Sequence, residues 1–243
     1  MNYSSRENES TPRRGRQGGP PLALVGGLTL GFLIGGLIVS SLLGGVTPSP
    51  FGPADAVVGY YRGHPVAVEG SAVFLFASSV PLLIYAATAS ARLRQLGITA
   101  PGATIALAGG IVASATLSLS ALLGWTLSRP AVSADTALVH ALSMLVFLVG
   151  GPGHVVPLGL LLAGIAVPSL IVGLLPRPAA WAGLIIAVVA ELSTLALVFA
   201  PLAILLPIAR FSALIWLVVA GVLLPTQRAN ANAGRTRAAS VPG

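Results

Sequence analysis

Long apolar segments alternate with short polar ones along most of this chain. A membrane-spanning helix needs about 20 mostly apolar residues. Five segments reach that length and a sixth is just long enough; the six are 22–46, 69–90, 101–127, 155–175, 180–199 and 208–225. The pattern therefore predicts an all-α fold, a polytopic bundle of transmembrane helices.

A further apolar segment, 134–149, is short and contains His140. It either crosses the membrane as a seventh span or lies partly embedded at one interface. Arginine placement separates the two alternatives, because cytoplasmic flanks collect basic residues. With a cytoplasmic N-terminus, six spans leave ten Arg inside and only Arg62, Arg129 and Arg210 outside, whereas seven spans divide them seven to six. We therefore expect six spans plus a partly embedded helix.

The two ends of the chain differ from its middle. Residues 1–20 and 226–243 are polar, rich in Gly, Pro and Ser, and without apolar periodicity, which predicts disordered basic tails around a transmembrane domain at 21–225. Seven of the 13 Arg lie in these tails. This distribution suits contact with anionic lipid headgroups and not a nucleic-acid-binding face.

Composition narrows the chemistry. Hydrophobic residues make up 55% of the chain and charged residues 8%, with a mean hydropathy of +0.93, whereas soluble domains carry about 25% charged residues. The chain has no Cys, and its 13 basic residues are all Arg. Without Cys there is no disulfide framework, thiolate nucleophile or Cys-ligated metal, and without Lys there is no P-loop lysine or Schiff base. We expect no cofactor.

Small residues predict where helices meet, because apolar packing gains little hydrophobic free energy in lipid and close backbone approach replaces it. The first span carries a tandem G-x-x-x-G, and the third and fifth spans repeat small residues at helical spacing. In the fifth span the stripe consists of Ala180, Gly183, Ala187, Glu191 and Thr194, and we expect that face to contact protein. The residues expected at helix contacts are Gly27, Gly31, Gly35, Gly110, Ser114 and Gly183.

Glu191 and Arg210 are the candidate functional residues within the membrane. A carboxylate near the middle of a span costs several kcal/mol unless it is paired or protonated, so a functional role is the default hypothesis for Glu191. The alternative is a protonated Glu that only locks the bundle. Arg210, at the end of its predicted helix, either pairs with Glu191 or extends to the headgroups.

His64, His140 and His154 form a weaker candidate constellation with nearby carboxylates. In the six-span topology all three imidazoles approach the outer surface, where they and acidic side chains could bind zinc or another divalent metal. No His-x-x-x-His or Glu-x-x-His spacing fixes such a geometry. Interfacial histidines that only form hydrogen bonds are the alternative, and we predict no metal site.

The segment Gly150–Pro225 contains GGPGHVVPLGLLLAG, GLLPRPAAWAGLIIAVVAELSTL and LLPIARFSALIWLVVAGVLLP. It resembles a family of uncharacterised bacterial polytopic membrane proteins, a domain of unknown function, over about a third of the chain. Relatives tend to carry an aromatic residue directly after the Pro-Arg pair, where this chain has Pro178. The resemblance implies about six helices in the inner membrane and supplies no catalytic residues.

Together these features predict a multi-pass inner-membrane protein with a cytoplasmic N-terminus. The leading expectation is a non-enzymatic membrane component that packs in the lipid bilayer with itself or with another membrane protein. The alternative is a transporter for a small solute or coupled ion that uses Glu191 near the bilayer midplane. A transporter needs a polar cavity that reaches Glu191, whereas a structural protein is packed dry around it.

Overall fold

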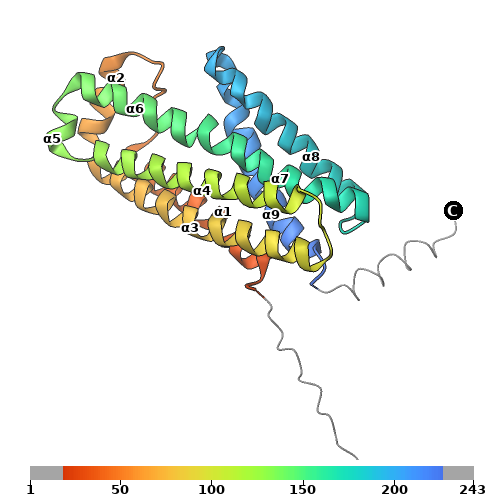
Figure 1. Cartoon of the computed structure of the whole chain (residues 1–243). Helices are drawn as coiled ribbons and strands as arrows, with labels where there is room; N and C mark the ends of the chain where they lie inside the picture. Colours follow the sequence, from red (N-terminus) through yellow and green to blue (C-terminus); the bar gives the residue numbers. More distant parts are fainter. Residues whose placement is uncertain (1–18, 227–243) are drawn as a thin grey trace, which may run out of the picture.

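The computed structural model describes residues 19–226, and all regular secondary structure in that range is helical (Figure 1). Residues 1–18 and 227–243, most of the two predicted tails, lie outside the described residues. The elements are α1 (Leu22–Gly44), α2 (Ala54–Gly63), α3 (Pro65–Gln95), α4 (Gly102–Leu127), α5 (Pro130–Ser133), α6 (Thr136–Gly150), α7 (Pro152–Val172), α8 (Arg177–Leu192), the 3₁₀ segments η1 (Ser193–Leu197) and η2 (Ala200–Ile204), and α9 (Leu205–Leu223).

Six helical segments in the described range are long and apolar enough to cross a membrane, which confirms the predicted all-α polytopic fold. The segments are Leu22–Gly44, Pro65–Gln95, Gly102–Leu127, Thr136–Val172, Arg177–Leu197 and Ala200–Leu223. The chain is therefore a multi-pass membrane protein. The last span begins at Ala200 and not at residue 208, because Pro201 and Pro207 occupy first-turn positions, where proline is tolerated.

The predicted short segment 134–149 is not a separate element beside the span that follows it. Helices α6 and α7 follow one another along one edge of the bundle (Figure 1) and together form the single candidate span Thr136–Val172. A bend separates them at Gly151, where Pro152 begins α7 without an amide hydrogen to donate. The glycine-rich segment 150–154 thus bends one long helix.

The spans form a closed ring of neighbours in which α1 contacts α3, α3 contacts α4, α4 contacts α7, α7 contacts α8, α8 contacts α9, and α9 returns to α1. Fully buried side chains such as Leu82, Tyr85 and Leu161 fill the middle. The Tyr85 hydroxyl donates to the Leu217 carbonyl over 2.7 Å, which joins α3 to α9 by a bond that lipid cannot replace.

Glycines bring the backbones of neighbouring spans into contact. A Cβ atom added to Gly164 on α7 would lie 2.5 Å from the Ala106 nitrogen and 2.6 Å from the Gly102 oxygen, both on α4. A Cβ atom on Gly221 of α9 would lie 2.6 Å from the Ala23 nitrogen of α1. Real Cβ atoms do not approach backbone so closely, so these crossings require glycine.

Four of the predicted packing residues lie at contacts within the chain. Ser114 donates to the Ser79 carbonyl over 2.6 Å, and a Cβ atom on Gly110 would meet the Ala86 side chain. Gly183 lies under the Trp216 ring, and a Cβ atom on Gly35 would lie 2.8 Å from the Phe74 ring.

Gly27 and Gly31 differ from that expectation, because a Cβ atom on either would meet nothing within 4 Å. The segment VGGLTLGFLIGG offers two overlapping series of small residues. The chain buries Gly26 and Gly36, one position away from the predicted series, and turns Gly27 and Gly31 outward.

We call the end of the bundle that carries α2 and α5 the α2 end, and the opposite end, near residues 19 and 226, the terminal end (Figure 1). At the α2 end, Arg62 Nε donates to the Ser133 carbonyl over 2.7 Å and holds α2 against α5. The Arg129 guanidinium lies 2.6 Å from Glu69 and 4.2 Å from the centroid of the Trp125 ring. These bonds occupy both arginines at this end of the bundle.

Candidate ligand cavity

A partly open cavity of about 430 Å³ lies in the half of the bundle nearest the α2 end. It forms where the last turns of α1, α4 and α6 meet the first turns of α3 and α9. Most of its wall is apolar, with Leu33, Leu37, Leu75, Leu206 and Phe211 among the lining residues. The polar residues on the wall are Ser40, Thr47, Tyr60, Tyr61, Ser71, Ser120 and Arg210.

Arg210 is the only charged residue on this wall. Because the last span begins at Ala200, Arg210 lies well inside it and not at its end. Its Nη2 donates to the Gly150 carbonyl, and its Nε is buried without a hydrogen-bond partner among the described residues. The side chain is thus held within the membrane-spanning bundle, beside the cavity.

The bend between α6 and α7 provides the carbonyl that binds Arg210. The His154 amide donates to the Gly151 oxygen over 3.1 Å, one residue short of the Gly150 oxygen that a regular helix would use. The Gly150 carbonyl therefore accepts from Arg210. Gly150 also has to be glycine, because an added Cβ atom would collide with the Ser120 hydroxyl.

No carboxylate neutralises Arg210 within residues 19–226, where the only ion pair joins Glu69 to Arg129. A guanidinium has five N–H donors, and a charged residue at membrane depth costs about 3 kcal/mol or more unless it is paired. One carbonyl satisfies one donor. The remaining donors and the positive charge are the groups that an oxyanion in the cavity would use.

Two tyrosines of α2 line the cavity nearest the α2 end. The Tyr60 hydroxyl accepts from Thr47 Oγ1 over 3.2 Å and lies 3.4 Å from Ser40 Oγ. Burial, and to a lesser extent Tyr60, raises the pKa of the Tyr61 hydroxyl to about 12. The Tyr61 hydroxyl is therefore neutral at physiological pH, and Arg210 is the only charged residue on the cavity wall.

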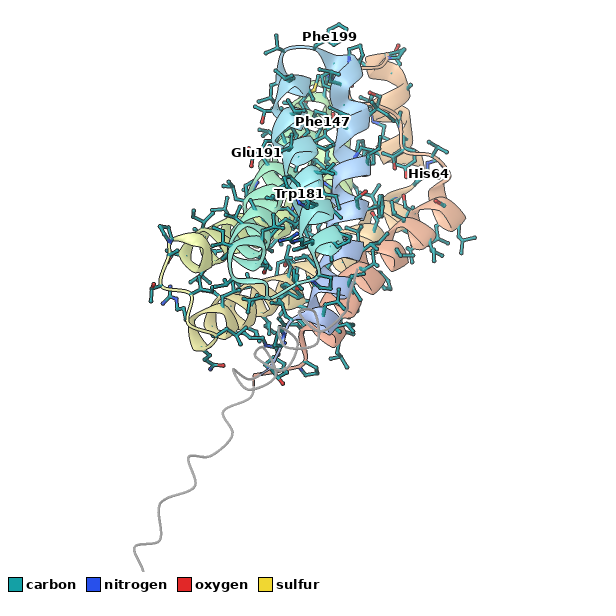
Figure 2. All side chains as sticks on the ribbon, turned by 90° about the vertical axis from the view of Figure 1, so that its right-hand side faces the viewer. His64, Phe147, Trp181, Glu191 and Phe199 are labelled. Carbon is teal, nitrogen blue, oxygen red and sulfur yellow. The ribbon has the colours of Figure 1, made fainter. Side chains whose placement is uncertain are left out.

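Glu191 lies outside this cavity. It is exposed on α8, on the opposite side of the bundle from His64 (Figure 2). The structure does not pair it with Arg210, which binds Gly150 instead. The stripe expected to face protein is buried at Ala187 but exposed at Glu191, because Ala190 takes the buried position in that turn.

The three histidines do not come together. His64 Nδ1 lies 3.2 Å from the Tyr60 carbonyl at the start of α3, whereas His154 is fully buried and its Nδ1 lies 2.8 Å from the Ala113 carbonyl. His140 is half-buried on α6. The bend at Gly151 places His154 inside the bundle and not at the surface, and the described residues contain no group of three potential ligands that could hold a metal ion.

Sequence reasoning identified Arg210 but not the polar residues that share its cavity. Tyr60, Ser71 and Ser120 belong to three different helices, and no spacing along the chain relates them. The only signal was their polarity within or beside apolar segments. No known family, curated protein or solved structure matches this chain, so the family resemblance of residues 150–225 stays a prediction and the cavity itself is the guide to function.

Proposed function

We propose that this protein is a non-enzymatic membrane component that binds a small amphiphile with an anionic headgroup in the cavity beside Arg210. The supporting observation is the Arg210 guanidinium beside a largely apolar cavity: its Nε is buried and unpartnered, and no carboxylate within residues 19–226 pairs with it. An oxyanion would fill the vacant donors, while an apolar tail would replace lipid against the leucine-rich wall.

The size of the cavity fits this class of ligand. At about 430 Å³ it falls within the range of roughly 300–1,000 Å³ that small-molecule sites occupy. A carboxylate and a phosphate monoester share the chemistry that a guanidinium recognises. The hydroxyls of Tyr60 and Tyr61 add hydrogen-bonding groups, and no acidic residue lines the cavity to compete with the ligand's charge.

This geometry favours Arg210 over Glu191 as the functional charge. A transport route through Glu191 requires a polar cavity that reaches it, and the cavity beside Arg210 does not include Glu191. The outward-facing Gly27 and Gly31 on α1 leave a small-residue surface for assembly with a second copy or another membrane protein. Ligand binding and assembly are compatible roles for one membrane component.

The binding test compares anionic and neutral amphiphiles of equal chain length. Purified protein in phosphatidylcholine nanodiscs is titrated with laurate, lauryl phosphate and dodecanol, and lysophosphatidate represents a lipid source of the same headgroup. We expect Arg210→Gln to weaken binding of the anionic probes at least about tenfold and to leave dodecanol unchanged. Arg177→Gln, which removes an arginine at the terminal end, is the matched control.

A second variant covers the case in which Arg210→Gln disturbs the bend at Gly150. Gly124 lines the cavity, and a Cβ atom there would meet only Ala72, at 3.8 Å. Gly124→Leu should therefore fold and fill the cavity, with loss of all three twelve-carbon probes, whereas Gly124→Ala should bind normally. Equal affinity for laurate and dodecanol in wild-type protein, or unchanged binding in Gly124→Leu, would reject the proposal.

We further propose that the terminal end lies in the cytoplasm and the membrane is the inner membrane of a cell. Among the described residues, the terminal end carries Arg92, Arg94 and Arg177, and the α2 end carries Arg62 and Arg129. The other seven arginines belong to the two tails, which are adjacent in sequence to the terminal end. Because the chain has no Cys, a single introduced cysteine is the only thiol in the protein that a reagent can label. Ala131→Cys should react with an impermeant thiol reagent in intact cells, and Thr99→Cys only after permeabilisation. The reverse labelling pattern would mean that the α2 end, and not the terminal end, lies in the cytoplasm.

A further inference from the structure

A second concave surface lies between α7 and α8, on the outside of the bundle. It is an open groove with almost entirely apolar walls, lined by Leu160, Ala163, Leu184, Ala187, Val188, Glu191, Leu192, Thr194 and Leu195. One wall runs from Leu184 to Leu192 on α8 and continues through Thr194 and Leu195 on η1. The other wall is one turn of α7, at Leu160 and Ala163.

Glu191 is the only charged residue in this groove. Its Oε1 lies over α7 near Gly159, where an added Cβ atom would be 3.4 Å away. The carboxylate has neither a hydrogen-bond nor an ion-pair partner among residues 19–226. It stands fourteen residues beyond Arg177, about 21 Å along the span, and is therefore at hydrocarbon depth.

We propose that this groove receives a transmembrane helix of another membrane protein, which places a Lys or Arg against Glu191. An acidic side chain at this depth is costly alone, and a basic residue on the seated helix removes that cost. The groove lies on the outer face of the bundle and is more open than the cavity beside Arg210. An apolar surface that faces lipid and carries one unpaired acidic group favours a transmembrane helix with a basic residue as the occupant.

The described residues of a second copy of this chain do not supply the complementary charge. Among the described residues, Arg62 and Arg129 are bonded at the α2 end, and Arg210 faces the internal cavity. The remaining described arginines, Arg92, Arg94 and Arg177, lie near the terminal end. None faces lipid at the depth of Glu191. This inference is independent of the amphiphile cavity, because the two sites share no lining residue.

The test uses a defined helix as the probe. A synthetic transmembrane peptide of Leu and Ala with one central Lys is compared with the same peptide lacking Lys. Binding to the full-length protein, labelled at Ala131→Cys, is measured by energy transfer in phosphatidylcholine vesicles. We expect the Lys peptide to bind about tenfold more tightly than the apolar peptide, and Glu191→Leu to abolish that difference.

Two tryptophan substitutions, one inside the groove and one outside it, test whether the peptide binds in the groove. Val188 in the groove and Leu24 on α1 are equally exposed apolar residues, at 57% and 58%. Val188→Trp should weaken binding of the Lys peptide about tenfold, and Leu24→Trp should leave it unchanged. If Val188→Trp binds the Lys peptide as tightly as wild type, the peptide does not lie in the groove, and the proposal is overturned.

Two further measurements distinguish other occupants. Glu191-dependent binding of tetraphenylphosphonium, with no preference for the Lys peptide, would identify a small lipophilic cation as the occupant. Energy transfer between two labelled copies of the protein that is lost in Glu191→Leu would identify a second copy. Either result overturns the proposed partner, and neither changes the expected behaviour of Arg210→Gln with laurate.

Discussion

Gly164→Leu should strongly destabilise the folded protein. The new side chain would begin at a Cβ atom 2.5 Å from the Ala106 nitrogen, so relief of the clash requires the α7 backbone to move away from α4. Because α4 and α7 are neighbours in the ring of spans, this separation should lower the free energy of unfolding by about 3 kcal/mol or more. The measurement is unfolding in mixed detergent and SDS micelles, followed by circular dichroism.

Gly31→Leu is the matched control for this prediction. It introduces the same side chain into another transmembrane glycine, but nothing lies within 4 Å of the position of its Cβ atom. The unfolding midpoint should therefore stay within experimental error of wild type. A loss of stability in Gly31→Leu equal to that in Gly164→Leu would mean that both effects come from helix propensity or insertion and not from the α4–α7 contact.

Trp216→Ala should release α8 from α9. Trp216 is only 4% exposed, its ring covers Gly183, and its indole nitrogen donates to the Ala179 carbonyl over 2.7 Å. Truncation to Ala removes the hydrogen bond to Ala179. It also leaves an empty space over Gly183, because glycine has no side chain to fill it. We expect the free energy of unfolding to fall by about 3 kcal/mol, measured in the same SDS titration.

Trp181→Ala tests whether that loss comes from packing. Trp181 lies on α8 itself (Figure 2), but it is 57% exposed. Its removal should change the unfolding free energy by less than about 0.5 kcal/mol. Trp216→Phe should give an intermediate loss, because phenylalanine fills much of the cavity but cannot donate to Ala179. Equal effects of Trp216→Ala and Trp181→Ala would contradict the proposed contact.

The lengths of apolar segments were enough to predict the helical fold and six spans, because crossing the hydrocarbon core sets a minimum length for a helix. Segment ends were harder to place. The last span was predicted to begin at residue 208, yet Pro201 and Pro207 fit first-turn positions, and the span extends back to Ala200. This shift moves Arg210 from a helix end to the side of a cavity.

The sequence predicts which face of a helix is buried only where the helix has one dominant series of small residues. On α1, two glycine series lie one residue apart, and the partner helix decides which of them is buried. Contacts at Gly164 and Gly221 depend on which helices cross, information that periodicity within one segment does not contain. The cavity depends on seven elements at once, so no local pattern could reveal it.

The turn between η1 and η2 has a consequence for how the protein is made. Its tip consists of Val198 and Phe199, which are 90% and 58% exposed, and the Phe199 amide is satisfied by the Leu195 carbonyl at 2.8 Å. Between Arg177 and Arg210 the chain carries a single charged residue, Glu191. The last two spans can therefore enter the bilayer together as a hairpin during synthesis, without any hydrophilic loop being translocated.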